Sequence, residues 1–343
     1  MSELVTLNEI RAAKERIHDV AVRTPLYRLE RARLQLAKLP EPSFDLYIKA
    51  ESEQPIGSFK LRGAYNMVSQ LSPEARSRGV ITYSSGNHAQ GVAYAARALG
   101  AKAVIVMPSN APEVKKAATR ALGAEIVEVG PASSERLKKA EELVAQFGYA
   151  MIPPYDAPEI VAGQGTCGLE IVEQLPDVDL VLAPVSGGGL LSGVSTAVKL
   201  AAQEGLASPD IKVWGAEPEL AADARESFYS KTLVEWPAEK TTRTIGDGLR
   251  TQSLGTLNFE HILRHVDGIV TVTEEEIYAA LRIFLTATKL IAEPSGAVTL
   301  AAALFHAHEL PAARKVAVVL SGGNLEPALR ERLESEITAT AAQ

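Results

Sequence analysis

Short runs of β-branched residues alternate with alanine-rich segments along most of this 343-residue chain. In the alanine-rich segments, apolar residues recur three and four positions apart and charged residues lie opposite them, which is a helical pattern. This alternation of strand and helix predicts an α/β fold with open, mostly parallel sheets flanked by helices. The predicted strands are Val80–Tyr83, Ala103–Met107, Glu125–Val129, Asp179–Ala183, Lys212–Ala216, Gly268–Val272 and Lys315–Leu320. The predicted helices are His88–Leu99, Glu113–Leu122, Ser134–Phe147, Leu191–Ala202, Glu274–Lys289 and Ala297–His306.

Length and charge narrow the class of protein. At roughly 150 residues per domain, the chain is long enough for about two domains. It carries 35 basic and 42 acidic residues, and this net charge of −7 argues against a nucleic-acid-binding surface. Cys167 is the only cysteine, so no internal disulfide can form. No apolar run approaches the ~20 residues of a membrane span, and the first residues lack a signal-peptide pattern. We therefore expect a cytoplasmic protein without a membrane or nucleic-acid partner.

Three of the predicted strands end in polar or glycine-rich motifs, at the position where open α/β sheets bind ligands. The motif Ser84–His88 opens a helix, whose N-terminal amides suit an anion such as a carboxylate. Helix capping accounts for one such polar residue, but not for two serines, an asparagine and a histidine together. The motif Ser186–Leu190 contains three successive glycines, which allow backbone amides to approach a phosphate closely. Ser321–Asn324, after the last strand, is a weaker signal of the same kind.

Lys60 stands between Phe59 and Leu61 in the run Gly57–Ala64. A lysine at the start of a helix is often part of the solvated surface. A partly desolvated lysine, in contrast, is an amine nucleophile that can form a Schiff base. Taken alone, the residues leave both interpretations open.

Together and in this order, the four motifs resemble those of the fold-type II pyridoxal-phosphate enzymes, whose fold is like that of the tryptophan synthase β subunit. The most similar branch contains the serine/threonine dehydratases and serine racemases. The resemblance extends from Arg23–Leu26 to Ser321–Asn324. It implies the cofactor pyridoxal 5'-phosphate, a homodimer and a two-domain chain. Residues 1–78 and 158–343 would form the large cofactor-binding domain and residues 79–157 the small domain, with Lys60 in the cleft between them. Because the chain ends about 20 residues after Asn324, we expect no C-terminal regulatory domain.

The resemblance also implies roles for individual residues. Lys60 matches the Schiff-base lysine, and Phe59 matches an aromatic residue packed against the cofactor ring. The Ser186–Leu190 loop would hold the phosphate, Ser321 would face the pyridine nitrogen, and Asn87 would bind the phenolic oxygen. The complete set of expected cofactor-binding residues is Phe59, Lys60, Asn87, Ser186, Gly187, Gly188, Gly189, Leu190 and Ser321. The expected substrate-binding residues are Ser84, Ser85, Asn87, His88 and Arg136.

The implied activity is the β-elimination of L-threonine or L-serine to 2-oxobutyrate or pyruvate and ammonia. Lys60 would remove the α-proton as general base. Ser85 stands where racemases of this branch carry a second acid/base on the opposite face of the α-carbon, so serine racemase is an alternative. Arg136 falls near the position of an arginine that reaches a second substrate carboxylate. A 3-hydroxyaspartate ammonia-lyase is therefore another alternative.

The segment Glu217–Asp223 resembles the divalent-cation site of the same branch. Glu217, the carbonyl of Ala221 and Asp223 would be the ligands. Two carboxylates and a carbonyl suit hard ions such as Mg²⁺, Mn²⁺ or Ca²⁺. Without the resemblance, an acidic surface loop would explain the same residues.

Three positions depart from the pattern of the branch. Ile56 replaces a common threonine, Gly246 replaces the usual alanine before Asp247, and Gln252 looks like an insertion. The last two lie on a loop expected near the cofactor, and the substrate preference stays open there.

The main alternative class is a nicotinamide-dependent oxidoreductase with a Rossmann domain. Gly187–Gly193 nearly matches G-x-G-x-x-G, but the last glycine falls one place late, and this interpretation leaves Lys60 unused. A non-catalytic protein of the same fold would not need Lys60 either. No G-x-S-x-G motif of a serine hydrolase occurs. A zinc site is not expected, because His306 and His308 are two positions apart and are assigned to a solvated helix surface.

Overall fold

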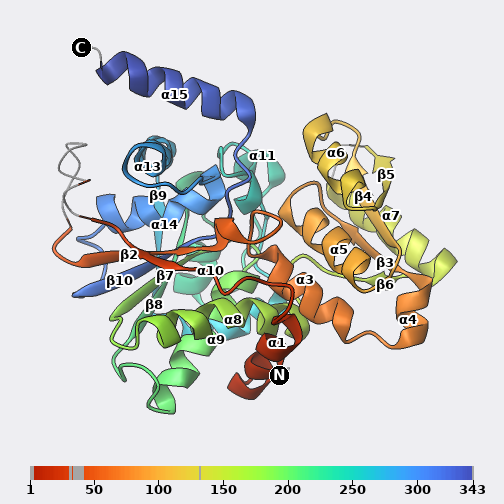
Figure 1. Ribbon diagram of the computed structural model, residues 1–343, viewed down its shortest axis with the longest axis horizontal. Helices are drawn as coiled ribbons and strands as arrows, with labels where there is room; N and C mark the ends of the chain where they lie inside the picture. The colour runs from red at the N-terminus through yellow and green to blue at the C-terminus, as the bar shows by residue number, and fades with distance from the viewer. Residues whose placement is uncertain (1–3, 31–32, 34–41, 131–132, 342–343) are drawn as a thin grey trace.

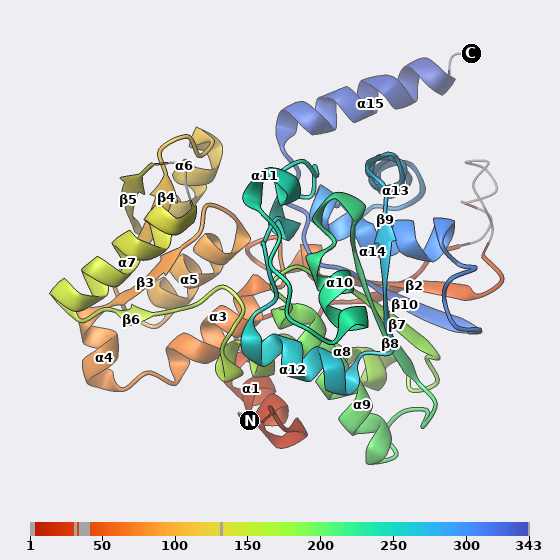
Figure 2. The same cartoon turned by 180° about the vertical axis from the view of Figure 1, so that it is seen from behind.

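A computed structural model describes residues 4–30, 33, 42–130 and 133–341. They form two sheets, each flanked by helices, that lie beside one another (Figures 1 and 2). The strands of the larger sheet are β1 (Leu26–Arg28), β2 (Asp45–Ala50), β7 (Leu180–Pro184), β8 (Lys212–Pro218), β9 (Gly268–Val272) and β10 (Lys315–Leu320). Their order is β1-β2-β10-β7-β8-β9, and all neighbours are parallel except β1 and β2. The strands of the smaller sheet are β3 (Val80–Tyr83), β4 (Ala103–Pro108), β5 (Glu125–Val129) and β6 (Ala150–Met151). Their order is β5-β4-β3-β6, and all are parallel.

The larger sheet separates two apolar cores, because successive side chains of a strand point to opposite faces. The helices and 3-10 turns around it are α1 (Leu7–Ile17), η1 (Glu51–Glu53), α8 (Pro158–Gln174), α9 (Gly189–Gln203), η2 (Glu219–Ala221), α10 (Asp223–Ser230), α11 (Ala238–Thr241), η3 (Asp247–Leu249), α12 (Thr256–His265), α13 (Glu274–Ala287), α14 (Pro294–Phe305) and α15 (Pro327–Ala341). In β7, Val181 and Ala183 pack in the core formed with α1, α8, α9 and α12. Leu180 and Leu182 pack in the core formed with α13 and α14. Helix α15 projects from the body of the molecule (Figure 1).

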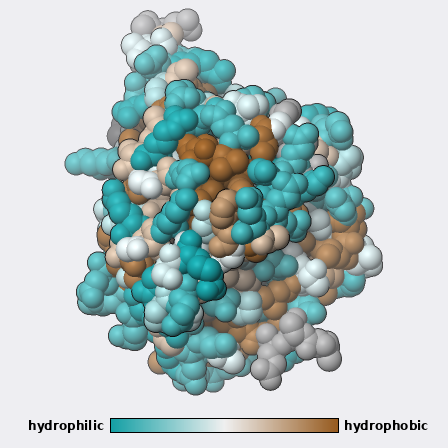
Figure 3. Space-filling model, turned by 90° about the vertical axis from the view of Figure 1, so that its right-hand side faces the viewer, coloured by the Kyte–Doolittle hydropathy of each residue, from teal (hydrophilic) through white to brown (hydrophobic). Residues whose placement is uncertain are grey.

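The smaller sheet is covered in the same way. Its helices are α3 (Lys60–Ser69), α4 (Pro73–Arg78), α5 (Asn87–Ala98), α6 (Glu113–Ala121) and α7 (Ser133–Phe147). Ile105 and Met107 of β4 pack with α3 and α5, whereas Val104 and Val106 pack with α7. Figure 3 views the molecule from this side: hydrophilic residues cover most of the surface, and apolar residues gather near its centre.

Helices α3, α8 and α9 touch through glycines. A Cβ atom on Gly163 of α8 would lie 2.6 Å from the Cα of Gly63 in α3. A Cβ atom on Gly193 of α9 would lie 2.5 Å from the backbone nitrogen of Gly165 in α8. Only glycine permits backbones to approach so closely. Because α3 begins at Lys60 and α9 begins at the glycine-rich loop, these contacts fix the two motifs relative to one another.

The predicted α/β class with mostly parallel sheets is confirmed, and every predicted strand is present within two residues of its expected ends. Helix α8 was not predicted, because it contains internal glycines and is buried along most of its length, so it shows neither helix propensity nor an amphipathic pattern. The assignment of His306 to a solvated helix surface is wrong: α14 ends at Phe305, and His306 bonds to Glu276 and Glu309. Within the described ranges, no helix has the length and apolar character needed to cross a membrane.

Candidate active site

Lys60 is the first residue of α3, which packs between α5 of the smaller-sheet part and α8 of the larger-sheet part. The side chain is half-buried, and its Nζ donates a hydrogen bond to the carbonyl oxygen of Pro154 at 2.6 Å. Burial lowers the pKa of Lys60 to about 8. A larger share of this amine is therefore unprotonated at neutral pH than for an ordinary lysine, as a nucleophile or general base requires.

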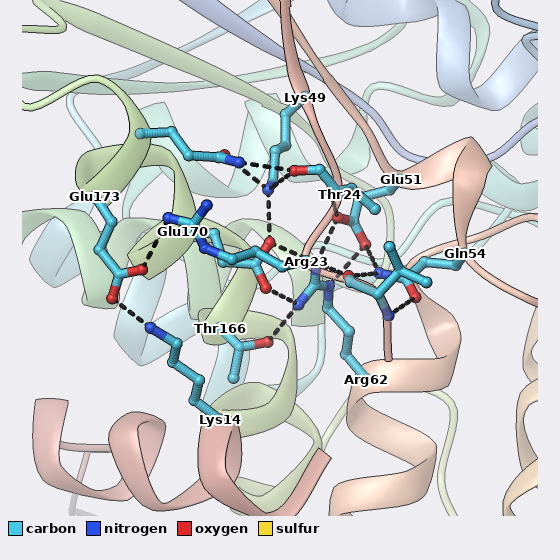
Figure 4. A network of polar contacts seen from close by, with 12 residues as sticks. Lys14, Arg23, Thr24, Lys49, Glu51, Gln54, Arg62, Thr166, Glu170 and Glu173 are labelled. Carbon is cyan, nitrogen blue, oxygen red and sulfur yellow. Dashed lines mark hydrogen bonds and ion pairs between the residues drawn. The ribbon is translucent and has the colours of Figure 1, made fainter. Parts of the chain in front are cut away.

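Arg62 anchors the start of α3 in a buried ion network (Figure 4). Its guanidinium donates to both carboxylate oxygens of Glu51, each at 2.7 Å, and to those of Glu170 at 2.8 and 2.9 Å. Lys49 Nζ donates to Glu170 at 2.6 Å, so two cations face two anions. Since β2 carries Lys49 and α8 carries Glu170, the network holds the helix of Lys60 against both elements.

The Ser84–His88 motif forms the turn into α5, as predicted. Ser84 and Ser85 are partly exposed, and Ser84 Oγ accepts the N–H of Gly86 at 3.3 Å. The ring of His88 is buried and bonds to the carbonyl of Ile152 at 3.0 Å. Burial, together with the charge of Lys60, lowers the pKa of His88 to about 3, so the ring is neutral. The neutral ring has no charge to attract an anion, whereas the backbone N–H of His88 lies in the first turn of α5.

Asn87 is held by two residues that the sequence did not single out for this purpose. Its Nδ2 donates to Glu293 Oε1 at 2.7 Å, and its Oδ1 accepts Nδ2 of Asn324 at 2.8 Å. Glu293 is buried, and burial together with the nearby Asp247 raises its pKa to about 7. The two bonds fix the plane of the Asn87 amide. Glu293 carried no local signal and Asn324 was only part of a weak motif, because both contacts span more than 200 residues of sequence.

The glycine-rich loop lies between β7 and α9. Gly188 has φ +94°, a left-handed conformation that favours glycine. A Cβ atom on Gly187 would lie 2.4 Å from the ring of Tyr155, so the aromatic ring packs directly on the loop. Ser186 Oγ and Thr251 Oγ1 lie 2.6 Å apart. The N–H groups of the first turn of α9 have no preceding carbonyl to bond, which leaves them for an anion.

The first and last motifs meet at the end of β10. The N–H of Phe59 donates to the carbonyl of Ser321 at 3.0 Å, and Ser58 forms a β-bridge with Gly322. Ser321 is 3% exposed. Lys60 Nζ lies 5.2 Å from the centre of the Phe59 ring. A buried hydroxyl residue and the amine therefore occupy adjacent segments.

Arg136 lies in α7, at the edge of the smaller sheet where β3 ends. It is half-buried, and burial lowers its pKa. The charge of Arg136 also acts on Tyr83, the residue immediately before Ser84. Arg136 is thus near the Ser84–His88 turn rather than on a distant surface.

Glu217 and Asp223 are both buried, at the end of β8 and the start of α10. Glu217 Oε1 accepts the N–H of Arg225 at 2.6 Å, but Glu217 Oε2 and both carboxylate oxygens of Asp223 have no hydrogen-bond partner. Burial raises the pKa of Glu217 well above its usual range and that of Asp223 to about 7. In the described ranges, no three His, Cys, Asp or Glu side chains lie close enough together to form a metal site by themselves. Two carboxylates beside the buried Ala221 nonetheless form an oxygen donor set that a hard cation fits.

The groups described above have complementary chemical capacities. The amine of Lys60 can bind a carbonyl carbon, and the first turn of α9 can bind a phosphate. The first turn of α5 offers a second set of amides, suited to a carboxylate. The helices that carry these groups come from both sheets, since α3 and α5 pack with the smaller sheet and α9 packs with the larger one.

Comparison with known proteins agrees with this chemistry. Residues 17–322 match the family model described as "Pyridoxal-phosphate dependent enzyme". The chain is 39% identical to the L-threo-3-hydroxyaspartate ammonia-lyase of Saccharomyces cerevisiae, over 94% of each protein. It is 37% identical to the serine racemase of Schizosaccharomyces pombe, over 94% of this chain and 95% of the relative. Among solved structures, a threonine deaminase of T.th. superposes with a TM-score of 0.84 and 44% identity, over 94% of this chain and 99% of that one.

Proposed function

Because the chain belongs to the family of pyridoxal-phosphate-dependent enzymes, we propose that it is an ammonia-lyase acting on L-threonine or L-serine. The products are 2-oxobutyrate or pyruvate, and ammonia. The observation that carries this proposal is the half-buried amine of Lys60, with its pKa lowered to about 8, beside the turn into α5. A relative that is an ammonia-lyase and a structural neighbour that is a threonine deaminase support it.

The residues fit pyridoxal 5'-phosphate group by group. Lys60 would bind its aldehyde carbon, the amides of Ser186–Leu190 its phosphate, and Asn87 its phenolic oxygen. Ser321 would face the ring nitrogen, and Phe59 would pack beside the ring. When bound, the cofactor supplies the electron-withdrawing ring that acidifies the α-proton of an amino acid.

The protein's own residues then orient the substrate and move the proton. The N–H groups at the start of α5, with Ser84 and Ser85, would bind the α-carboxylate. Lys60 would take the α-proton, for which an amine of pKa about 8 is well matched to neutral pH. Asn87, held by Glu293 and Asn324, would keep a fixed orientation during the reaction.

A specific observation favours 3-hydroxyaspartate as a second candidate substrate. Arg136 is half-buried and close to Tyr83, directly before the serine pair. A guanidinium there suits the second carboxylate of that substrate. Racemisation of serine is a further outcome that Ser85 would permit, if its hydroxyl acts as a second acid/base.

We also propose that Glu217, the carbonyl of Ala221 and Asp223 bind a divalent cation. The unpartnered buried carboxylate oxygens support this site. The measurement is thermal unfolding of the cofactor-loaded protein with Mg²⁺ or with EDTA. At a Mg²⁺ concentration 100 times its dissociation constant, linkage gives about 2.7 kcal/mol of stabilisation. The Glu217→Gln/Asp223→Asn variant should lack this Mg²⁺-dependent gain; an equal gain in the variant would place the cation elsewhere.

The division into residues 1–78 with 158–343 and residues 79–157, the homodimer and the cytoplasmic location are also proposals. The two sheets support the division, since residues 80–151 hold all four strands of the smaller one. Light scattering of the purified protein tests the homodimer, and its localisation in the source cell tests the compartment.

The activity test is one incubation series with the cofactor-loaded protein. L-threonine, L-serine and L-threo-3-hydroxyaspartate are supplied separately, and both 2-oxo acid formation and the chirality of the remaining amino acid are measured. Oxo acid from threonine or serine supports the main proposal. Faster release from 3-hydroxyaspartate would replace it with the second candidate, and accumulation of D-serine would make the protein a racemase. The Lys60→Ala variant should form none of these products.

A further inference from the structure

The carbonyl of Gly187 is held from outside the glycine-rich loop. It accepts the N–H of Gly255 at 3.0 Å and the side-chain Nδ2 of Asn258 at 2.7 Å. Asn258 lies in the first turn of α12 and is fully buried. The same Nδ2 also donates to the carbonyl of Tyr155 at 3.3 Å. One side chain thus ties the loop to the residue whose ring packs on it.

Holding this carbonyl sets the direction of the next N–H. In a trans peptide the C=O and the following N–H point in opposite directions, and the described chain has no cis peptide. The carbonyl of Gly187 points to α12, so the N–H of Gly188 points away from α12. Among the described residues, no acceptor contacts that N–H. It is a donor that a bound anion would satisfy.

Gly188 is also pressed against the same helix. Its φ is +94°, and a Cβ atom on it would lie 2.9 Å from the Cβ of Asn258. A side chain at position 188 would therefore collide with Asn258, so the loop can lie this close to α12 only because the residue is glycine.

Asn258 is itself fixed. Its N–H donates to the carboxylate of Asp156 at 3.3 Å, and its carbonyl accepts the hydroxyl of Ser192 at 3.1 Å. Reversing the side-chain amide would set Oδ1 against two carbonyl oxygens, which cannot donate a proton. Only one orientation of the amide keeps these contacts.

On the basis of the cofactor site proposed above, we propose that Asn258 is a positioning residue for the cofactor's phosphate. It acts through the Gly187–Gly188 peptide and does not touch the phosphate. Without its amide, the Gly187 carbonyl keeps only the N–H of Gly255, and the peptide can rotate. Losing the amide should weaken only the part of the cofactor affinity that depends on the phosphate, because the groups that would contact the ring and the aldehyde are unchanged.

The experiment compares two ligands that differ only in the phosphate. Full-length protein freed of cofactor is titrated with pyridoxal 5'-phosphate and, separately, with pyridoxal. The variants are Asn258→Ala and Asn258→Asp, neither of which keeps the amide donor. The phosphorus NMR resonance of the loaded protein gives a second readout that reports on the phosphate alone.

Asn66→Ala is the matched control. Asn66 is also a fully buried asparagine whose Nδ2 donates to a backbone carbonyl, that of Glu159 at 2.7 Å, but it lies outside the loop. Both alanine variants should lower the melting temperature. Only the change at position 258 should alter the discrimination between the two ligands.

We expect both Asn258 variants to bind pyridoxal 5'-phosphate about tenfold or more weakly, with a shifted phosphorus resonance. Their affinity for pyridoxal should change by less than about twofold. Equal weakening for both ligands would reduce Asn258 to a structural residue and overturn the inference, as would unchanged binding of both. If the unsubstituted protein binds both ligands equally well, the proposed phosphate site is wrong. If the unsubstituted protein prefers the phosphorylated ligand and Asn258→Ala keeps that preference, only the inference about Asn258 is wrong.

Discussion

At the scale of single residues, burial moves the pKa values of the site's amine and carboxyl groups in opposite directions. Burial favours the neutral form, so the pKa of Lys60 falls to about 8 while that of Glu293 rises to about 7. His88 is neutral for the same reason, although the charge of Lys60 adds to the effect. The site thus contains a basic amine, a neutral imidazole and a carboxyl group that titrates near physiological pH.

Glu293 makes stability depend on pH in a direction that can be checked. Its folded pKa of about 7 lies above the ordinary value of 4.5, so the folded state holds its proton more tightly. The resulting stabilisation is complete below pH 4.5 and is lost as the pH rises through 7. Its upper limit is about 3 kcal/mol. Relative to Glu293→Gln, the unsubstituted protein should therefore lose stability between pH 5 and 8, measured by chemical unfolding at several pH values.

The control for this comparison is Glu275→Gln, because Glu275 is exposed on α13. The stability of the Glu275→Gln variant should change with pH in the same way as the stability of the unsubstituted protein. Parallel curves for the unsubstituted protein and Glu293→Gln would contradict the assignment of the titration to Glu293.

At the scale of elements, the start of α3 depends on a network with balanced charges. Arg62, Glu51, Glu170 and Lys49 are all buried, and the guanidinium bonds to both carboxylates (Figure 4). Breaking such a network on one side leaves buried charges uncompensated, which is more costly than never having placed them there.

Arg62→Met should lower the free energy of unfolding by about 3–5 kcal/mol. The free energy of unfolding of Arg62→Lys should lie between those of Arg62→Met and the unsubstituted protein. A lysine keeps the charge but loses the planar fork that bonds to both carboxylates. Arg23→Met is the control: its side chain is 52% exposed and has one ion pair, with Glu173 at 3.3 Å, worth less than about 1 kcal/mol. Urea unfolding measures all three variants, and similar losses for Arg62→Met and Arg23→Met would refute the role of the network.

His306 joins the end of α14 to the start of α13. Nε2 bonds to Glu276 at 2.9 Å and Nδ1 bonds to Glu309 at 2.7 Å. Both ring nitrogens need a proton to donate to carboxylates, so the contact requires the charged form. Burial opposes that charge, but the two carboxylates outweigh it and the pKa of His306 is raised.

Because this pKa is raised on folding, the stabilisation is complete below pH 6.5 and is lost as the pH rises through the folded value. His306→Gln should lower the melting temperature at pH 6 by roughly 2 °C and have less effect at pH 8.5. His308→Gln is the matched control, because His308 is 76% exposed and only approaches Glu309 at 3.9 Å. Differential scanning fluorimetry at both pH values suffices; an equal effect of His306→Gln at each pH would disprove the charged contact.

Some helices, strands and turns could be predicted from the sequence, and others could not. β-branched strands such as β3 and β9 were located to the residue, since their pattern is local. The motifs at the ends of β3, β7 and β10 were also visible, because glycines and serines cluster there. Glu293 and Asn258 were not, because each is an isolated polar residue whose role depends on contacts across 206 and 71 residues of sequence. Local patterns therefore located the turns proposed to bind ligands but not the side chains that orient them.

At the scale of the whole molecule, an ion pair joins the two sheet-containing parts. Lys115 of α6 contacts Asp247 of η3 at 2.5 Å and Glu326, ahead of α15, at 3.5 Å. Asp247 lies next to Gly248, whose N–H donates to Ser295 at the start of α14. The contact thus reaches from the smaller sheet to the loop beside the candidate active site.

Lys115→Ala should increase hydrogen–deuterium exchange in residues 244–252 and in α6 by roughly two- to fivefold, because it removes two partly exposed ion pairs of modest strength. Lys102→Ala is the control, since Lys102 pairs with Glu125 within the smaller-sheet part. Its exchange in residues 244–252 should match the unsubstituted protein. Exchange unchanged by Lys115→Ala would show that other contacts hold the two parts together.

The glycine contacts among α3, α8 and α9 have a consequence for protein engineering. A Cβ atom at Gly163, Gly168 or Gly193 would meet backbone atoms at 2.5–2.7 Å, and backbone cannot move aside as a flexible side chain can. A mutant library aimed at new substrates should therefore keep these positions invariant. Its diversity belongs at Ser85, Arg136 and other partly exposed residues around the turn into α5, the proposed substrate-binding positions, which lie outside these glycine contacts. The close backbone contacts therefore distinguish positions that a library can vary from positions where only glycine is tolerated.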